Sequence, residues 1–253
     1  MKYYFIIVSF AICMFSCHQG EAPDKRDAYY TRHGNKIVIT PIKHASIQIS
    51  YQGKEIEIDP VSSYSRPIVD YTDKPKADYI LITNEHRDHF DPYAIGILCK
   101  QSTNILLPLR CIVKFRKTQI YSHCVEFNNN MKAKLADDIT VYSVPAYNHT
   151  DKYKRSLAPK GRGNGYLLDI DGFRIYIAGD TEPITEMKRL GKIDVAFLPC
   201  DYIQAMTLKQ YREAVKIIRP KTLYPYHYGA TDTDSIIMMT KGLDIDVRLR
   251  SLK

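Results

Sequence analysis

A dense group of metal-ligand residue types follows an apolar run in the first half of the chain. Residues 79–83 are Tyr-Ile-Leu-Ile-Thr, and they lead directly into Asn-Glu-His-Arg-Asp-His. Asn84 and His86 are expected to project together, because alternate side chains of an extended strand share a face. Asp88 and His89 follow where the chain turns toward a helix. Imidazole and carboxylate ligands at this density predict a divalent metal centre, with a surface ion pair as the alternative interpretation.

This segment and several later ones resemble motifs of the metallo-β-lactamase superfamily. That family reads H-x-H-x-D-H, often followed by Phe or Leu, Asp and Pro, and this chain reads N-E-H-R-D-H-F-D-P from Asn84. Ala-Gly-Asp-Thr around Asp180 is similar to the family's G-D-T, and Pro-Tyr-His-Tyr-Gly around His227 is similar to its terminal metal histidine. The resemblance runs from about Lys36 to the C-terminus. Shorter stretches that resemble the lactonase-like branch are residues 42–46, 58–60, 145–148 and 159–166.

The resemblance implies two metal positions, and only the second keeps its ligands: Asp88, His89 and His227, with Asp180 bridging. The first position is depleted, because Asn84 replaces one histidine and Ala158 stands where related sequences place another. His86 remains there, and an amide oxygen is a weaker ligand than imidazole for zinc-like ions.

His149 is a candidate replacement ligand for the first position. It lies one residue off the motif, so a solvated loop histidine is the favoured interpretation. We therefore expect one divalent ion, and two ions are not excluded. Zinc is the first choice of metal, with manganese or iron as alternatives.

The implied chemistry is hydrolysis of a carbonyl or phosphoryl centre by a metal-activated water. Asp88 or Asp180 would orient or deprotonate that water. Loss of the second Lewis acid is expected to slow the reaction or to abolish it. The competing hypothesis is a catalytically degenerate relative that binds a ligand or a partner without turnover.

Residues on the substrate side are implied by the same resemblance: His44, Tyr147, Asn148, Lys160, Arg162 and Asn164. Residues 147–164 read as a long loop that is rich in basic side chains, with Lys152, Lys154 and Arg155 besides the two already named. A basic loop at the mouth of a site favours a phosphate- or carboxylate-bearing substrate, and a solvated charged loop is the alternative. The expected substrate is a small anionic ester, lactone or phosphodiester. No nucleic-acid partner is expected, because the basic residues are otherwise scattered.

The elements that must position these residues follow from hydrophobic periodicity. The first half predicts mainly strands, including a β-meander over residues 36–58. The second half alternates strands with helices, such as an amphipathic helix over 208–218 that ends before Pro220. Two sheets covered by helices satisfy this order, so we expect an α/β protein with a four-layer αββα sandwich.

The N-terminus carries a targeting pattern. Lys2 precedes an apolar run over residues 3–15, and Ser16 and Cys17 follow, as in a lipoprotein signal. We expect a signal peptide over residues 1–16, lipidation at Cys17, a tether over 17–35 and the domain over 36–253. A buried N-terminal helix or cleavage without lipid are the alternatives. The expected location is the cell envelope, with a lipid in the membrane.

Composition adds two constraints. The formal net charge of +8 is compatible with anionic substrates or anionic lipid surfaces. Four cysteines remain after the signal region, without C-x-x-C spacing, so a zinc ribbon is not expected. The sequence does not pair them: Cys99, Cys111, Cys124 and Cys200.

Overall fold

The computed structural model describes residues 26–64, 66–150, 158–201 and 205–252. They form two seven-stranded sheets of related topology. In each sheet, four strands pair antiparallel and the remaining strands add in parallel.

The first sheet follows the chain from β1 to β7 without a crossover in strand order. Antiparallel pairing runs from β1 to β4, and parallel pairing runs from β4 to β7. The strands are β1 (Asp27–Tyr30), β2 (Lys36–Lys43), β3 (Ser46–Tyr51), β4 (Lys54–Ile58), β5 (Tyr79–Leu81), β6 (Asn104–Leu107) and β7 (Cys124–Glu126).

The second sheet repeats this plan from β8 to β14. Its antiparallel part carries β8 to β11, and its parallel part carries β11 to β14. The strands are β8 (Lys132–Ala136), β9 (Ile139–Ala146), β10 (Gly163–Ile170), β11 (Phe173–Ile177), β12 (Val195–Pro199), β13 (Thr222–Tyr226) and β14 (Asp246–Val247).

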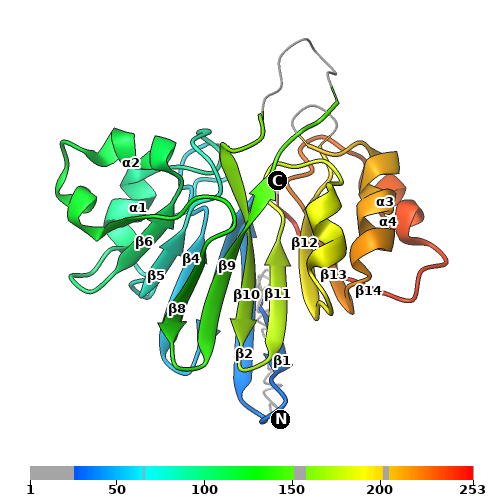
Figure 1. Ribbon diagram of the computed structural model, residues 1–253, viewed down its shortest axis with the longest axis horizontal. Helices are drawn as coiled ribbons and strands as arrows, with labels where there is room; N and C mark the ends of the chain where they lie inside the picture. The colour runs from blue at the N-terminus through cyan, green and yellow to red at the C-terminus, as the bar shows by residue number, and fades with distance from the viewer. Residues whose placement is uncertain (1–25, 65, 151–157, 202–204, 253) are drawn as a thin grey trace, which may run out of the picture.

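Helices cover the outer sides of both sheets. Figure 1 shows α1 and α2 on the left and α3 and α4 on the right, with the strands between them. The predicted four-layer αββα arrangement is thereby confirmed. The helices are α1 (Pro92–Leu98), α2 (Leu109–Phe115), α3 (Leu208–Ile218) and α4 (Thr233–Thr240), with 3-10 turns η1 (Gln119–His123) and η2 (Thr185–Arg189).

The helix α3 forms where its local pattern predicts it. Thr207 and Gln210 make a reciprocal capping box at its start, which satisfies backbone N–H groups that lack intrahelical partners. Its buried residues, Tyr211, Ala214, Val215 and Ile218, fall on one helical face and pack into the main core.

Two hydrophobic clusters hold the layers together. The larger lies between the sheets and includes Ile49, Ile58, Tyr166 and Phe197. The smaller packs α1 and α2 onto the first sheet, with Ile80, Ile82 and Phe115 among its members. Because alternate residues of β5 and the chain just after it enter different clusters, this segment is buried on both sides.

The domain begins earlier than the sequence predicts. Residues 27–30, assigned above to the tether, form β1 and pair antiparallel with β2. The side chain of Asp27 accepts hydrogen bonds from Arg248, Arg250 and Tyr224. Backbone pairing with β2 and long-range ion pairs of Asp27 therefore hold this short segment, and a search for apolar periodicity does not detect them.

The predicted signal peptide and Cys17 lie outside the described residues. Within the described ranges, no helix has the length and apolar character needed to cross a membrane. The four cysteines that the sequence could not pair are all free thiols.

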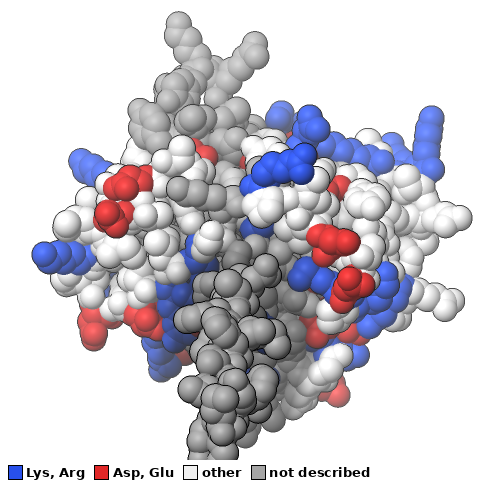
Figure 2. Space-filling view, turned by 180° about the vertical axis from the view of Figure 1, so that it is seen from behind, with Lys and Arg blue, Asp and Glu red and all other residues white. Residues whose placement is uncertain are grey.

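Charges are mixed on the molecular surface. Figure 2 shows Lys and Arg interspersed with Asp and Glu on the face seen from behind. The positive net charge of the chain is therefore not gathered into one basic patch on the visible part of this face.

Candidate metal centre

The predicted ligands converge because they follow strands from both sheets. His44 follows β2, and residues 84–89 follow β5 in the first sheet. Asp180 and His227 follow β11 and β13 in the second sheet. Parallel strands present their carboxyl ends at a common edge, so loops far apart in sequence meet there.

Four side chains form a compact group, in which the ligand atoms all lie within 4.8 Å of one another: His44, Asp88, His89 and His227. Asp88 Oδ2 is 3.3 Å from His44 Nε2 and 3.3 Å from His227 Nε2. The same oxygen is 3.9 Å from His89 Nε2. The sequence places His44 on the substrate side, but the structure places its imidazole within this group of potential ligands.

Asp180 borders the same group and also faces the depleted position. Its Oδ1 is 3.1 Å from His89 Nε2 and 3.3 Å from His227 Nε2. Its Oδ2 accepts a hydrogen bond from Asn84 Nδ2 at 3.1 Å and lies 3.3 Å from His86 Nδ1. This is the location that a bridging carboxylate requires.

Unpaired polar atoms at the centre show that these residues fit a metal ion. Among the described residues, His89 Nε2, His227 Nε2 and Asp180 Oδ1 are buried without a hydrogen bond. They lie close together, but not in hydrogen-bond alignment. Buried polar atoms are normally paired, and an ion at the centre would satisfy all three. A set of imidazole and carboxylate donors suits zinc, manganese or iron.

Asp59 and Thr83 orient one of the ligands. Asp59 Oδ2 is 2.7 Å from His89 Nδ1, and both side chains are fully buried. Thr83 donates to the same carboxylate through its backbone N–H at 2.7 Å and its hydroxyl at 2.6 Å. A carboxylate behind a metal-binding imidazole fixes its ring orientation and leaves Nε2 facing the ion.

Electrostatics within the cluster favour ionised carboxylates. Burial raises the pKa of Asp88, but the imidazoles of His227 and His44, each 3.3 Å away, outweigh burial and hold that pKa far below its usual range. Burial also raises the pKa of Asp180, and the charges of His89 and His227 again outweigh it.

The pKa values of His89 and His227 shift in the opposite direction, upward, whereas burial lowers the pKa of His44. Burial lowers the pKa of His89, but the carboxylates of Asp180 and Asp59 raise it well above its usual range. Protons thus balance the buried negative charge in the metal-free protein. A divalent cation would take over that role, because metal binding displaces ligand protons.

The backbone is strained at three positions around this cluster. His44, Asp59 and His227 have φ angles of 49°, 44° and 44°, values that residues other than glycine seldom adopt. Backbone hydrogen bonds tie the segments together, from His227 N to His44 O at 3.1 Å and from His44 N to Leu252 O at 2.8 Å. Strain of this kind persists only where the surrounding structure holds it, as at functional sites.

The depleted first position is a small cavity of about 10 Å³ that is lined by Asn84, Glu85, His86, Ala158, Arg162, Gly163 and Asp180. The side chains of His86 and Asn84 both face Asp180 here. Arg162, an exposed residue, also lines this cavity, and its positive charge opposes a second cation electrostatically. The structure thus brings Arg162 to the site, but beside the metal position.

His149 does not enter the cluster. Its Nε2 lies 3.0 Å from the carbonyl oxygen of Pro183, and its Nδ1 lies 3.5 Å from Glu182. Its side chain is 51% exposed. The loop turns this ring toward Pro183, so it is not placed to replace a histidine at the first position.

Three residues predicted to contact substrate have other partners. The hydroxyl of Tyr147 donates to Glu186 at 3.1 Å, and Lys160 Nζ lies 3.6 Å from the same carboxylate and 4.8 Å over the Tyr147 ring. Asn164 is buried, donating from Nδ2 to Phe127 O and accepting from Asn129. Asn164 is therefore engaged within the protein. The structure shows no contact between these three and the cluster.

Asn148 is the last of the residues predicted on the substrate side. Asn148 pairs through its backbone N–H with Ala158 O at 2.8 Å. Lys152, Lys154 and Arg155 lie outside the described residues.

The sequence interpretation did not single out Tyr64, whose ring lies 5.5 Å from that of His44. No motif marks this residue; only the fold brings its loop to the cluster.

Comparison with known proteins identifies the family. A family model described as the beta-lactamase superfamily domain matches residues 38–227. A UPF0173 metal-dependent hydrolase from Caldivirga maquilingensis is 28% identical over 218 residues, covering 83% of this chain and 92% of that protein. Another from Thermococcus onnurineus is 30% identical over 197 residues, covering 74% and 82%.

Solved structures agree with this relationship. The crystal structure of a protein assigned as a metal-dependent hydrolase from Parabacteroides distasonis has a TM-score of 0.82 and 41% identity, covering 90% of this chain and 99% of its own. The metallo hydrolase Igni18 from Ignicoccus hospitalis shares the fold, with a TM-score of 0.70, 24% identity, and coverage of 85% and 95%. The chain therefore belongs to the metallo-β-lactamase superfamily, and its relatives there are metal-dependent hydrolases.

Proposed function

We propose that this protein hydrolyses a small anionic ester, lactone or phosphodiester and that it uses one divalent ion, with zinc as the first choice. The observation that carries the proposal is the convergence of unpaired buried atoms from His89, His227 and Asp180. The ligands would be Asp88, His89, Asp180 and His227, with His44 within reach of the same centre.

A bound ion would supply Lewis acidity, which lowers the pKa of a water molecule and polarises the bond under attack. Asp180 is placed to orient the nucleophilic water, since its two oxygens face different sides of the site. Asn84 donates a hydrogen bond to Asp180, which holds that carboxylate in one orientation. His86 is 37% exposed beside the same carboxylate, so it is placed to exchange a proton with solvent.

A single ion is favoured over two by the chemistry of the first position. Asn84 and Ala158 offer no imidazole there, and Arg162 brings a positive charge. His149 faces Pro183 instead. The missing imidazole ligands at the first position also support the alternative function, a binding protein without turnover.

We further propose that the mature chain is attached to the cell envelope by a lipid on Cys17. The support is the order of Lys2, the apolar run, Ser16 and Cys17 in the sequence. Metabolic labelling with a fatty-acid analogue should tag the protein, and Cys17→Ser should remove the tag. Labelling that survives Cys17→Ser would contradict this proposal.

The first test is the metal content of the purified protein, measured by elemental analysis. We expect about one equivalent of a divalent metal, as for a site with four protein ligands. Asp180→Ala should reduce the content to near zero. Asp137→Ala is the matched control, because Asp137 is an exposed aspartate that pairs only with Lys134 among the described residues.

Each outcome separates the hypotheses. If the protein binds metal and turns over a lactone or phosphodiester, and if Asp180→Ala abolishes that turnover, the hypothesis of a binding protein without turnover is excluded. Metal uptake without turnover across such a panel would favour it. Failure to bind any transition metal would refute the hydrolase proposal.

A further inference from the structure

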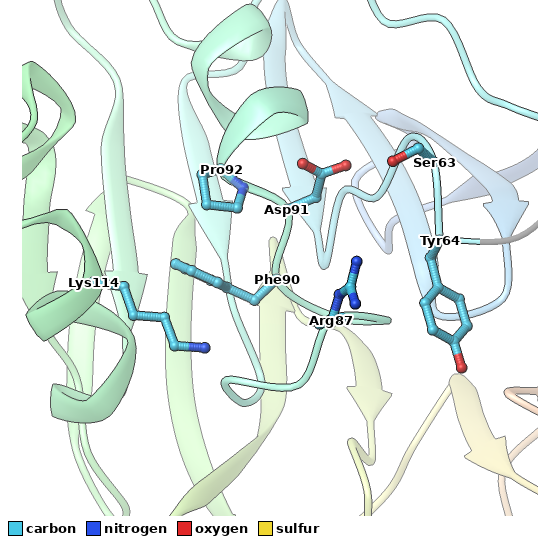
Figure 3. Close-up of a pocket in the computed structure, with 7 residues that line it drawn as sticks. All are labelled: Ser63, Tyr64, Arg87, Phe90, Asp91, Pro92 and Lys114. Atoms are coloured by element: carbon cyan, nitrogen blue, oxygen red, sulfur yellow. The ribbon is translucent and has the colours of Figure 1, made fainter.

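A second cavity is lined in part by the ligand-bearing loop of the metal centre. It has a volume of about 460 Å³ and is lined by Ser63, Tyr64, Arg87, Phe90, Asp91, Pro92 and Lys114. Figure 3 shows Arg87 between Tyr64 and Phe90, with Lys114 on the far side of Phe90. A volume of this size falls within the range of small-molecule sites.

The cavity is joined to the metal centre through its lining. Arg87 is flanked in sequence by His86 and Asp88, so its backbone belongs to the ligand loop. The ring of Tyr64 lies 5.5 Å from that of His44, which lies 3.3 Å from Asp88. A molecule in this cavity would therefore lie beside the metal-binding group.

Two cations, Arg87 and Lys114, line the cavity wall. Among the described residues, neither Arg87 nor Lys114 forms an ion pair. Lys114 Nζ donates to the carbonyl oxygen of Glu85 at 2.8 Å and lies 5.2 Å from the centre of the Phe90 ring. The carboxylate of Glu85 is 3.8 Å from Arg110 instead.

The single carboxylate in the lining is committed to the backbone. Asp91 accepts from the N–H groups of Ser62 at 2.9 Å, Tyr93 at 3.0 Å and Ala94 at 3.4 Å. It caps α1 and anchors the loop of Ser62, so three of its roughly four acceptor positions are used there. The lining thus carries two cations against one carboxylate, which is hydrogen-bonded to the backbone.

The remaining lining favours a planar body for the ligand. Tyr64 lines the cavity and is 46% exposed, so its ring is accessible to a ligand. Phe90 and Pro92 add apolar surface on the opposite side. Arginine recognises carboxylate and phosphate groups through its planar fork of donors.

We infer that this cavity binds the anionic part of the substrate, a carboxylate or phosphate carried on a small ring, between Arg87 and Lys114. The inference rests on the proposed function, which it deepens by assigning the charged end of the substrate to this cavity and the reacting end to the metal centre. The basic loop predicted from sequence is then not the main anion-binding element.

The test uses ¹⁹F NMR titration of the purified protein with 4-fluorobenzoate, which has no bond to hydrolyse. Its matched neutral probe is 4-fluorobenzamide. We expect 4-fluorobenzoate to bind at least about fivefold more tightly than 4-fluorobenzamide, because charge-assisted contacts on an exposed surface contribute a preference of this size. Arg87→Gln and Lys114→Gln should each remove most of that preference. Lys117→Gln, an exposed lysine just beyond α2, is the control and should keep it.

The same titration is run on chelator-treated and zinc-loaded protein, because a carboxylate can also coordinate a metal. The inference is supported if the protein prefers the anionic probe without zinc and if Arg87→Gln loses this preference. Equal affinity for both probes, or no binding up to about 10 mM, overturns it. Anion preference that appears only with zinc and survives both variants also overturns it. Metal content and turnover are measured separately, so either proposal can fail while the other stands.

Discussion

The carboxylate of Asp59 lies 2.7 Å from Nδ1 of His89, and both side chains are completely buried. This contact connects a residue at the end of β4 with a ligand that follows β5. It leaves Nε2 of His89 facing Asp180. The orientation of the ligand is therefore set by a residue that does not itself touch the metal position.

Asp59→Asn should weaken metal binding while leaving the fold intact. The amide cannot supply the same negative charge to His89, and loss of such a partner typically costs about 10- to 100-fold in affinity. Competition with a chelating dye measures the change. Asp137→Asn is the control, since its exposed carboxylate pairs with Lys134. Unchanged affinity in Asp59→Asn would show that Thr83 alone is sufficient to orient the ring.

Restoring imidazoles at the first position should create a second metal site. Asn84→His with Ala158→His supplies the missing ligands, and we expect metal content to rise from about one to nearly two equivalents. The additional change Arg162→Gln should tighten the second ion, because it removes a positive charge from the lining. Elemental analysis of the three proteins measures this. Two equivalents already present in the unmodified protein would contradict the prediction.

Glu57→Gln should stabilise the protein at neutral pH. Glu57 is fully buried in β4, and among the described residues neither of its carboxylate oxygens has a hydrogen-bond partner. Burial raises the pKa of this group well above its usual value. The folded state therefore holds a proton that the unfolded chain releases, so this group costs stability as pH rises above about 4.3 toward the folded pKa.

The gain from Glu57→Gln should thus be near zero at low pH and about 1–3 kcal/mol at neutral pH. Urea denaturation across that pH range measures the difference from the unmodified protein. Glu126→Gln, an exposed position on β7, should show no comparable pH-dependent gain. A constant difference at every pH would mean that the pKa of Glu57 is the same in the folded and unfolded states, and it would contradict the prediction.

Gly179→Ala should destabilise the protein strongly. Gly179 has a φ of +69°, and an added Cβ would lie 2.6 Å from the backbone oxygen of Asn164. Gly34→Ala is the matched control, because Gly34 has a φ of +83° but open space around it. The control should lose about 1 kcal/mol from backbone strain alone, and Gly179→Ala should lose several times more. Thermal unfolding of both variants checks this, and equal losses would mean that the neighbouring strand yields.

Local patterns in the sequence predicted most of the secondary structure and the identity of the ligands. The helix over residues 208–218 was predictable from one face of apolar residues, because its burial depends on helical periodicity. Asp88, His89, Asp180 and His227 were recognisable from motifs at strand ends. These features are encoded within a few consecutive residues.

The tertiary structure decided what depends on residues distant in sequence. It placed His44 in the ligand group, turned His149 toward Pro183, and engaged Asn164 inside the protein. It also paired β1 with β2 in the first sheet and tied Asp27 to Arg248 and Arg250, near the other end of the chain. The cavity beside Arg87 arises in the same way, from a loop and a helix that meet only after folding. Side-chain direction and long-range pairing are set by packing, and no local pattern contains them.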